Sequence, residues 1–193
     1  KRNFETLAKR ARDAAVPGAE AELLALMKSD AYGHSLPEVA RALESLPANS
    51  GLHGFAVANV EEGIELRRSG IRRPIYVLSG IQHYDADLHR CLETVDLIPV
   101  IGSISVLRDL VRTLDDFPGE RIVHLKFNTG MNRLGIDPHE IEECLAILRS
   151  CSSVKVRGLL SHFAAGEKPS SALTRRQVAS FRAIVARFRQ EGF

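Results

Sequence analysis

Six short runs of apolar residues, rich in Val, Ile and Leu, recur along the chain, and longer stretches with helical spacing of apolar and polar positions separate them. Within the runs, successive positions are apolar, so neither face of a strand formed there is polar. This pattern is typical of parallel strands that are buried between two layers. The runs predict strands over 23–28, 54–57, 74–78, 97–101, 122–127 and 156–161.

The stretches between the runs carry signals for the ends of helices. Ser35-Leu36-Pro37-Glu38 predicts a capping box with a proline in the first turn, and Asn59-Val60-Glu61-Glu62 repeats that pattern. Gly70 is placed to end the second of these helices. Further helices are predicted from Ser103, from Asp137-Pro138 to about Arg149, and over about 170–190.

Strands that alternate with helices in units of roughly 20 to 35 residues indicate an α/β architecture. A doubly wound sheet normally has a glycine-rich phosphate turn after its first strand, but here the first run ends in Lys28. We therefore predict a TIM-type (β/α)8 barrel, of which about six β/α units are present. Either the chain is part of a longer barrel, or the barrel is not a closed eight-stranded one.

Composition narrows the class of protein. A hydrophobic content of 45% with 26% charged residues is ordinary for a soluble globular domain, and 193 residues suffice for one domain. The net charge of +2 gives no reason to expect nucleic acid or an anionic membrane as a partner. No apolar stretch reaches the roughly 20 residues of a membrane span, and Lys1 in place of Met suggests that the chain begins inside a longer one.

The cysteines and histidines do not predict a disulfide framework or a metal site. Cys91, Cys144 and Cys151 are odd in number and widely spaced, which favours a reducing, cytoplasmic compartment. Cys144 and Cys151 could share a helix face, and we interpret them as two small buried residues. His34 and His53 lack companions at the spacing of metal ligands.

Lys28 follows the apolar run Leu23 to Met27 and precedes Ser29-Asp30-Ala31-Tyr32-Gly33-His34. A lysine at the rim of a packed core loses water around its ammonium group, which favours the neutral amine that attacks aldehydes. Tyr32 lies close enough in sequence for its hydroxyl to contact whatever the lysine holds. Because barrel active sites form at the carboxyl ends of the strands, Lys28 is a candidate catalytic residue.

Two further segments end predicted strands. The first is 123–135, in which Lys126 ends the strand, Gly130 allows a sharp turn, and Arg133 offers a planar fork suited to a carboxylate. Taken alone, this segment is more often a surface loop with a solvated arginine. The second is Ser161-His162-Phe163, where a histidine after an apolar strand is either a satisfied structural residue or a site residue.

These segments resemble alanine racemase, a fold-type III enzyme dependent on pyridoxal 5′-phosphate (PLP). The usual form of the lysine segment in that family is Lys-Ala-Asp-Ala-Tyr-Gly-His-Gly, and this chain differs at Ser29 and Ser35. The second segment is Val-His-Leu-Lys-Val-Asp-Thr-Gly-Met-Asn-Arg-Leu-Gly in the family, and this chain differs at Phe127 and Asn128. The resemblance extends over nearly the whole chain, with weaker matches at 55–63 and 74–78.

The resemblance implies a role for each matched residue. Lys28 would hold the cofactor covalently and exchange a proton on one face of the substrate α-carbon. Tyr32 would bind the phosphate, Leu78 would line the ring, and His162 would pack against it. Arg133 would contact the phenolic oxygen of the ring and, together with Met131, the substrate. Lys126 matches a lysine that can be carbamylated, and Asn128, in place of Asp, makes that role less secure.

The resemblance also implies what a complete enzyme would contain. The PLP-binding barrel domain would span 1–193, the second base would be a tyrosine from a C-terminal β domain of the partner subunit, and the full-length protein would be a cytoplasmic homodimer. It would interconvert L-alanine and D-alanine to supply D-alanine for peptidoglycan, and residues 1–193 alone would be inactive. Two alternatives stay open: a non-catalytic PLP-homeostasis protein, and another enzyme of this fold, such as a broader amino-acid racemase or a D-amino-acid lyase.

Overall fold

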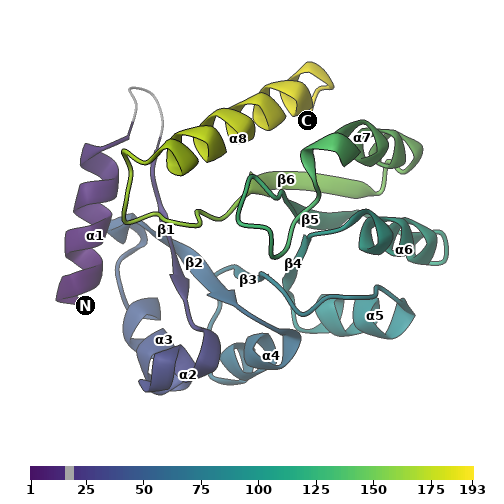
Figure 1. Ribbon diagram of the computed structural model, residues 1–193. Helices are drawn as coiled ribbons and strands as arrows, with labels where there is room; N and C mark the ends of the chain where they lie inside the picture. Colours follow the sequence, from purple (N-terminus) through teal and green to yellow (C-terminus); the bar gives the residue numbers. More distant parts are fainter. Residues whose placement is uncertain (16–19) are drawn as a thin grey trace. The chain divides into compact units, whose positions relative to one another are not determined.

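The computed structural model describes residues 1–15 and 20–193 and divides them into two compact units. The first unit comprises Lys1–Gly80 and Leu92–Ile98, and the second comprises Ile81–Cys91 and Pro99–Phe193. Figure 1 shows strands alternating with helices in both units, which is the α/β class expected from the sequence.

The first unit contains three parallel strands, in which β1 pairs with β2 and β2 pairs with β3. Its helices pack beside these strands (Figure 1). In chain order, its elements are α1 (Arg2–Asp13), β1 (Leu23–Leu26), α2 (Lys28–Gly33), α3 (Leu36–Glu44), a 3-10 turn (Ala48–Ser50), β2 (Leu52–Val57), α4 (Val60–Arg68) and β3 (Ile75–Val77).

The second unit also contains three parallel strands, in the pairing order β4, β5, β6. The division between the units falls within α5, after Cys91, and within β4, after Ile98. The elements here are α5 (Ala86–Thr94), β4 (Ile98–Ile101), α6 (Ile104–Leu114), β5 (Arg121–Lys126), a 3-10 turn (Pro138–Glu140), α7 (Ile141–Ser150), β6 (Val154–Leu160) and α8 (Ala172–Gln190).

All six predicted strands are present, with boundaries shifted by one or two residues. Burial on both faces is confirmed for β3, in which every residue is buried, and for most of β2. It is wrong for β1, because Leu24 and Leu26 are exposed. Since alternate strand residues share a face, these two leucines form an open apolar face on β1.

Most of the predicted helix starts are confirmed. Asn59 and Ser103 accept the backbone N–H of Glu62 and Val106, and Asp137 forms a capping box with Glu140. Gly70, with a φ of +86°, follows the end of α4 as expected.

The capping box expected at Ser35 is wrong. Ser35 has a φ of +68° and makes no side-chain cap, and the carboxylate of Asp30 accepts the N–H of Leu36 at 2.6 Å instead. The helices α1 and α5 are not among the elements expected from the sequence.

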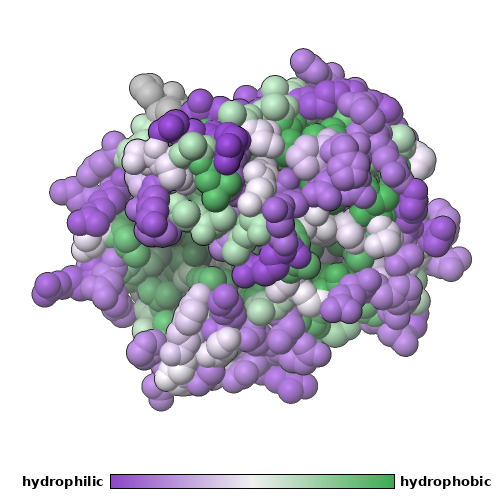
Figure 2. Space-filling view, in the orientation of Figure 1, coloured by the Kyte–Doolittle hydropathy of each residue, from purple (hydrophilic) through white to green (hydrophobic). Residues whose placement is uncertain are grey.

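The surface is largely polar on the face drawn in Figure 2, with apolar residues gathered in smaller patches among the charged ones. The arginines of α8 are mostly exposed, as their spacing predicts, and Arg187 pairs with Glu142 and Glu191. No helix in the described part of the chain is long and apolar enough to cross a bilayer. Cys144 is buried, whereas Cys151 lies at the C-cap of α7 and is half-buried.

Candidate active site

Lys28 lies immediately beyond the carboxyl end of β1, after the buried Met27. Its side chain is half-buried, and Nζ lies 5.6 Å from the centroid of the Tyr32 ring. Within residues 1–15 and 20–193, no carboxylate pairs with this amine. The amine is therefore available for chemistry, and the structure brings the two predicted residues of this segment together.

The turn after Lys28 is left-handed. Ser29, Asp30, Ala31 and Tyr32 have φ values between +52° and +57°, and the N–H of Ala31 donates to the carbonyl of Met27 at 2.9 Å. A non-glycine residue in this region costs about 1–2 kcal/mol, so four in succession need compensating contacts. The left-handed path leaves the Tyr32 side chain 60% exposed beside Lys28.

Two carboxylates hold this turn. Glu62 of α4 accepts the backbone N–H of Ser29 and of Ala58, both at 2.7 Å. Asp30 accepts the N–H of Leu36, which ties the end of the turn to the start of α3. The turn is therefore anchored to two helices, and both anchors are charge-assisted hydrogen bonds.

Leu78 follows β3 at the same end of this sheet. Its N–H donates to the carbonyl of Val57 at 2.9 Å, and its side chain is half-buried. The carboxyl ends of β1 and β3 in the first unit thus carry the predicted lysine and the predicted ring-lining residue.

Lys126 ends β5 in the second unit and is only 7% exposed. Burial lowers the pKa of its ammonium group, and the nearby positive charge of Arg133 lowers it further. Both effects favour the neutral amine. The structure therefore brings these two predicted residues within electrostatic reach of each other.

The turn that follows β5 is built around the side-chain amide of Asn128. Its Oδ1 accepts the N–H of Gly130 at 3.1 Å and of Asn132 at 3.0 Å. Its Nδ2 donates to Asn132 Oδ1 at 3.0 Å and to Asp137 Oδ1 at 2.7 Å. An aspartate here would lose both donors and face the carboxylate of Asp137, so the departure from the family form matches its surroundings in this chain.

The same turn is closed by a pair of backbone hydrogen bonds and by Gly135. Asn128 N–H donates to the carbonyl of Ile136 at 2.9 Å, and Ile136 N–H donates to that of Lys126 at 2.8 Å. Gly135 has a φ of +135°, and a Cβ there would lie 2.5 Å from the nitrogen of Asn128. Only glycine fits this position.

Arg133 and Met131 lie on this turn. The guanidinium of Arg133 is exposed and makes no hydrogen bond or ion pair with the described residues, and Met131 is half-buried. A cation held on a well-defined turn without a protein partner is suited to an anionic ligand.

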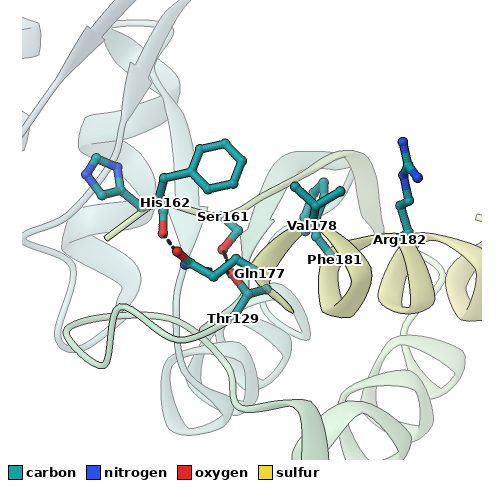
Figure 3. Close-up of a pocket in the computed structure, with 8 residues that line it drawn as sticks. Thr129, Ser161, His162, Gln177, Val178, Phe181 and Arg182 are labelled. Carbon is teal, nitrogen blue, oxygen red and sulfur yellow. Dashed lines mark hydrogen bonds between the residues drawn. The ribbon is translucent and has the colours of Figure 1, made fainter. Parts of the chain in front are cut away.

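The end of β6 lies beside this turn in the second unit. Ser161 Oγ donates to the carbonyl of Phe127 at 2.9 Å and lies 2.7 Å from Thr129 Oγ1. The side chain of His162 is exposed, and with Ser161 and Phe163 it lines a cleft of about 310 Å³ against α8 (Figure 3).

Two residues take part in contacts that the sequence does not predict. The sequence predicts Glu62 only as part of a capping box, and it does not single out Gln177. A signal for Gln177 exists, because it occupies a buried position in the helical spacing of Thr174, Ile184 and Phe188 on α8. A polar side chain on an apolar stripe needs partners.

One group in the described residues has the spacing of a metal site. Asp137, His139 and Glu140 offer ligand atoms within 4.8 Å of one another. The carboxylates of Asp137 and Glu140 already accept backbone N–H groups in the capping box. The cluster is therefore explained by the helix start.

Parallel strands that end in reactive side chains, each followed by a helix, define a barrel-type α/β domain. Comparison with known proteins supplies the family. The model of the family "Alanine racemase, N-terminal domain" matches residues 1–193, and the chain belongs to this family.

Similar proteins agree with this assignment. Alanine racemase from Sorangium cellulosum is 39% identical over 174 residues, which cover 89% of this chain and 44% of that protein. The crystal structure of alanine racemase from Streptomyces lavendulae is 27% identical, with a TM-score of 0.81 over 98% of this chain and 47% of that one.

The structure of alanine racemase from Bartonella henselae with covalently bound pyridoxal phosphate has the same fold. Its TM-score is 0.78 at 24% identity, and the match covers 96% of this chain and 51% of that one. The chain thus spans about half the length of the alanine racemases that it matches, and the barrel-type fold expected from the sequence is confirmed.

Proposed function

We propose that this chain is the PLP-binding domain of an alanine racemase, in which Lys28 carries the cofactor. The observation that carries the proposal is the Lys28 amine. It stands just beyond the carboxyl end of β1, has no carboxylate partner among the described residues, and lies beside the exposed ring of Tyr32. A lysine without an ion pair can form a covalent bond to an aldehyde without first giving up a charge partner.

The residues present fit this cofactor. Lys28 would hold it, Tyr32 would bind its phosphate, Leu78 and His162 would contact its ring, and Arg133 would bind its phenolic oxygen. When bound, PLP stabilises negative charge at the α-carbon of an amino acid. The Bartonella henselae alanine racemase carries pyridoxal phosphate covalently, which supports the same assignment here.

The side chains of this domain would bind and orient the amino acid and move one proton. Arg133 would hold the α-carboxylate, and Met131 would limit the space next to it. The amine of Lys28 would take or return the α-proton on one face. A second base for the other face is expected from a partner subunit, so the complete enzyme would be a homodimer.

We further propose that Lys126 is carbamylated. The neutral amine attacks the carbon of CO2, a C–N bond forms, and the proton released goes to water. Burial and Arg133 lower the pKa of Lys126, which raises the fraction of neutral amine. The carbamate is an anion, so the modification would replace repulsion between two cations by attraction between opposite charges.

Carbon-13 NMR after incubation with labelled bicarbonate tests this modification. We expect one carbamate signal in the wild-type protein and none in Lys126→Met, whereas Lys168→Met, at an exposed lysine, keeps the signal. A spectrum without a signal that depends on Lys126 would refute carbamylation.

The experiment that tests the proposed function follows solvent deuterium into alanine, using the protein in which this domain occurs. We expect exchange at the α-carbon and racemisation, both dependent on PLP. Lys28→Ala should lower the rate by at least about 1,000-fold, and Lys155→Ala should not.

The outcomes separate the remaining alternatives. Binding of PLP without α-exchange would favour a homeostasis protein. Equal rates with alanine and bulkier amino acids would favour a broader racemase. If alanine is the substrate, we propose that the product D-alanine serves peptidoglycan synthesis in the cytoplasm.

A further inference from the structure

Gln177 is a polar residue in an apolar position. It lies in the first half of α8 and is 1% exposed, whereas most other long polar side chains of this helix are exposed. Burying an amide costs free energy unless each of its polar atoms has a partner. The contacts of Gln177 therefore account for its presence.

The amide of Gln177 binds two separate loops of the second unit. Its Oε1 accepts the N–H of Ala164 at 3.0 Å, and its Nε2 donates to the carbonyl of His162 at 2.9 Å. The same Nε2 donates to Thr129 Oγ1 at 3.3 Å. Figure 3 shows the side chain reaching from α8 to His162 and Thr129.

The hydrogen bonds that run from Gln177 through Thr129 and Ser161 all have their donors and acceptors in the same order. The single hydroxyl proton of Ser161 goes to the carbonyl of Phe127, so Thr129 must donate to Ser161, and Thr129 must in turn accept from Gln177. Only a donor at position 177 completes this chain of hydrogen bonds. A carboxylate at position 177 has no proton to donate to Thr129, so this series of hydrogen bonds would lack its first donor.

The two loops carry proposed site residues. Thr129 begins the turn that leads to Arg133, and Ala164 and His162 lie in the segment after β6. α8 itself contributes no residue to the proposed cofactor contacts. Gln177 nevertheless bonds to both loops.

We propose that Gln177 is a positioning residue that fixes the Arg133 turn and the His162 segment relative to each other. It acts through Thr129 and through the backbone of the His162 segment. The functional part of this inference rests on the proposed PLP site, whereas the structural part does not.

Amide hydrogen exchange of the cofactor-free protein tests the structural part. In Gln177→Glu, the carboxylate still accepts the N–H of Ala164 but no longer donates to Thr129 or to the carbonyl of His162. We therefore expect exchange over 129–133 to be about 10-fold faster than in the wild type, with little change at Ala164 itself. Gln190→Glu makes the same chemical change at an exposed position of the same helix and should leave both segments unchanged. Equal exchange in wild type and Gln177→Glu would overturn the proposal.

A second variant keeps the test selective if Gln177→Glu is destabilised overall. Thr129→Val removes the hydrogen bonds of Thr129 with Gln177 and Ser161 and keeps those of Gln177 with Ala164 and His162, so exchange should rise over 129–133 and stay unchanged at Ala164. A uniform rise in both segments would contradict separate positioning of the two loops.

The protonation state gives a further readout. At about pH 5.5 the buried carboxyl of Gln177→Glu should be partly protonated and regain one donor, because burial raises the pKa of a carboxyl group. The exchange defect, measured against wild type at the same pH, should therefore be smaller at about pH 5.5 than at pH 8. A defect independent of pH would indicate a loss of packing alone.

PLP affinity tests the functional part. We expect the Kd of Gln177→Glu for PLP to rise about 10-fold at pH 8, with no change in Gln190→Glu. If the exchange result holds and affinity does not change, positioning of the cofactor site is refuted. If wild type binds no PLP, the proposed function fails, and the exchange data alone decide whether Gln177 fixes the two loops.

Discussion

Two strands of this protein have a lysine at or just beyond their carboxyl ends, and the two lysines differ in burial and in their neighbours. Lys28 is half-buried, faces an aromatic ring and is followed by a left-handed turn. Lys126 is almost fully buried and shares its surroundings with the cation of Arg133. The same sequence pattern, an apolar run that ends in lysine, thus yields an accessible amine in one unit and an enclosed amine in the other.

The backbone after each lysine explains the difference. After Lys28, four left-handed residues carry the chain away and leave the amine open. After Lys126, the chain folds back and pairs Phe127 with Ile136, and the N–H of Ile136 donates to the carbonyl of Lys126. We infer that the first strand end is suited to holding a ligand covalently, and that the second is suited to placing a charge.

Among the substitutions that test this comparison, Gly135→Ala is expected to have the largest effect on stability. The added Cβ would lie 2.5 Å from backbone atoms at a φ of +135°, so the turn that follows Lys126 must open. We expect a loss of about 3 kcal/mol in the free energy of unfolding, measured with urea. Gly119→Ala, at a φ of +111° with open space around it, should lose only about 1 kcal/mol. Equal losses would show that backbone strain, and not this close contact, is what matters.

The next effect concerns the turn after Lys28. Glu62→Gln leaves one acceptor oxygen for the two N–H groups of Ser29 and Ala58, and should cost about 2 kcal/mol of stability. Glu61→Gln, the exposed neighbour on α4, should cost less than about 0.5 kcal/mol. Urea unfolding of both variants measures this difference, and similar values would remove Glu62 as an anchor of the turn.

The third prediction uses pH. Because the pKa of Lys126 is lower in the folded protein than its usual 10.5, the folded state carries a penalty wherever Lys126 is protonated. The penalty is complete below the folded-state pKa and disappears as the pH rises through that value to 10.5. In buffers free of CO2, the wild type should therefore gain stability with rising alkaline pH relative to Lys126→Met. Lys168→Met should follow the wild type, and parallel curves for wild type and Lys126→Met would contradict a lowered pKa.

The smallest effect tests the left-handed turn itself. Ser29→Gly relieves steric cost at a φ of +53° and should change stability by between about 0 and +1 kcal/mol. Ala42→Gly, at an exposed right-handed position in α3, should cost about 1 kcal/mol. Urea unfolding measures the change in stability of each variant. A loss of stability in both variants would argue against the left-handed conformation at Ser29.

The sequence predicts the strands of this fold better than its turns. Strands such as β3 are predictable because apolar residues on both faces have few alternatives to burial between layers. The cap at the start of α3 is not predictable in this way. The carboxylate of Asp30, which the left-handed turn places next to Leu36, accepts the N–H of Leu36 in place of a cap from Ser35. No spacing rule for right-handed helices anticipates that turn.

The site divides in the same way. As candidates, Lys28 and Lys126 stand out in the sequence because they are charged residues at or just beyond the ends of apolar runs, and Arg133 stands out because it follows a glycine-containing turn. Gln177 and the second role of Glu62 depend on contacts between elements far apart in the chain. Such contacts are fixed by packing, and a single sequence does not reveal them.

The most direct test of the account is to incubate the protein with PLP, reduce it with borohydride, and map the modified lysine by peptide mass spectrometry. Reduction makes the bond between an amine and the aldehyde permanent, so the map reports which lysine reacts. We predict one adduct at Lys28, none at Lys126, and no adduct in Lys28→Ala. An adduct at Lys126, or an unmodified Lys28 in the wild-type protein, would contradict the assignment of the accessible amine as the cofactor-binding residue.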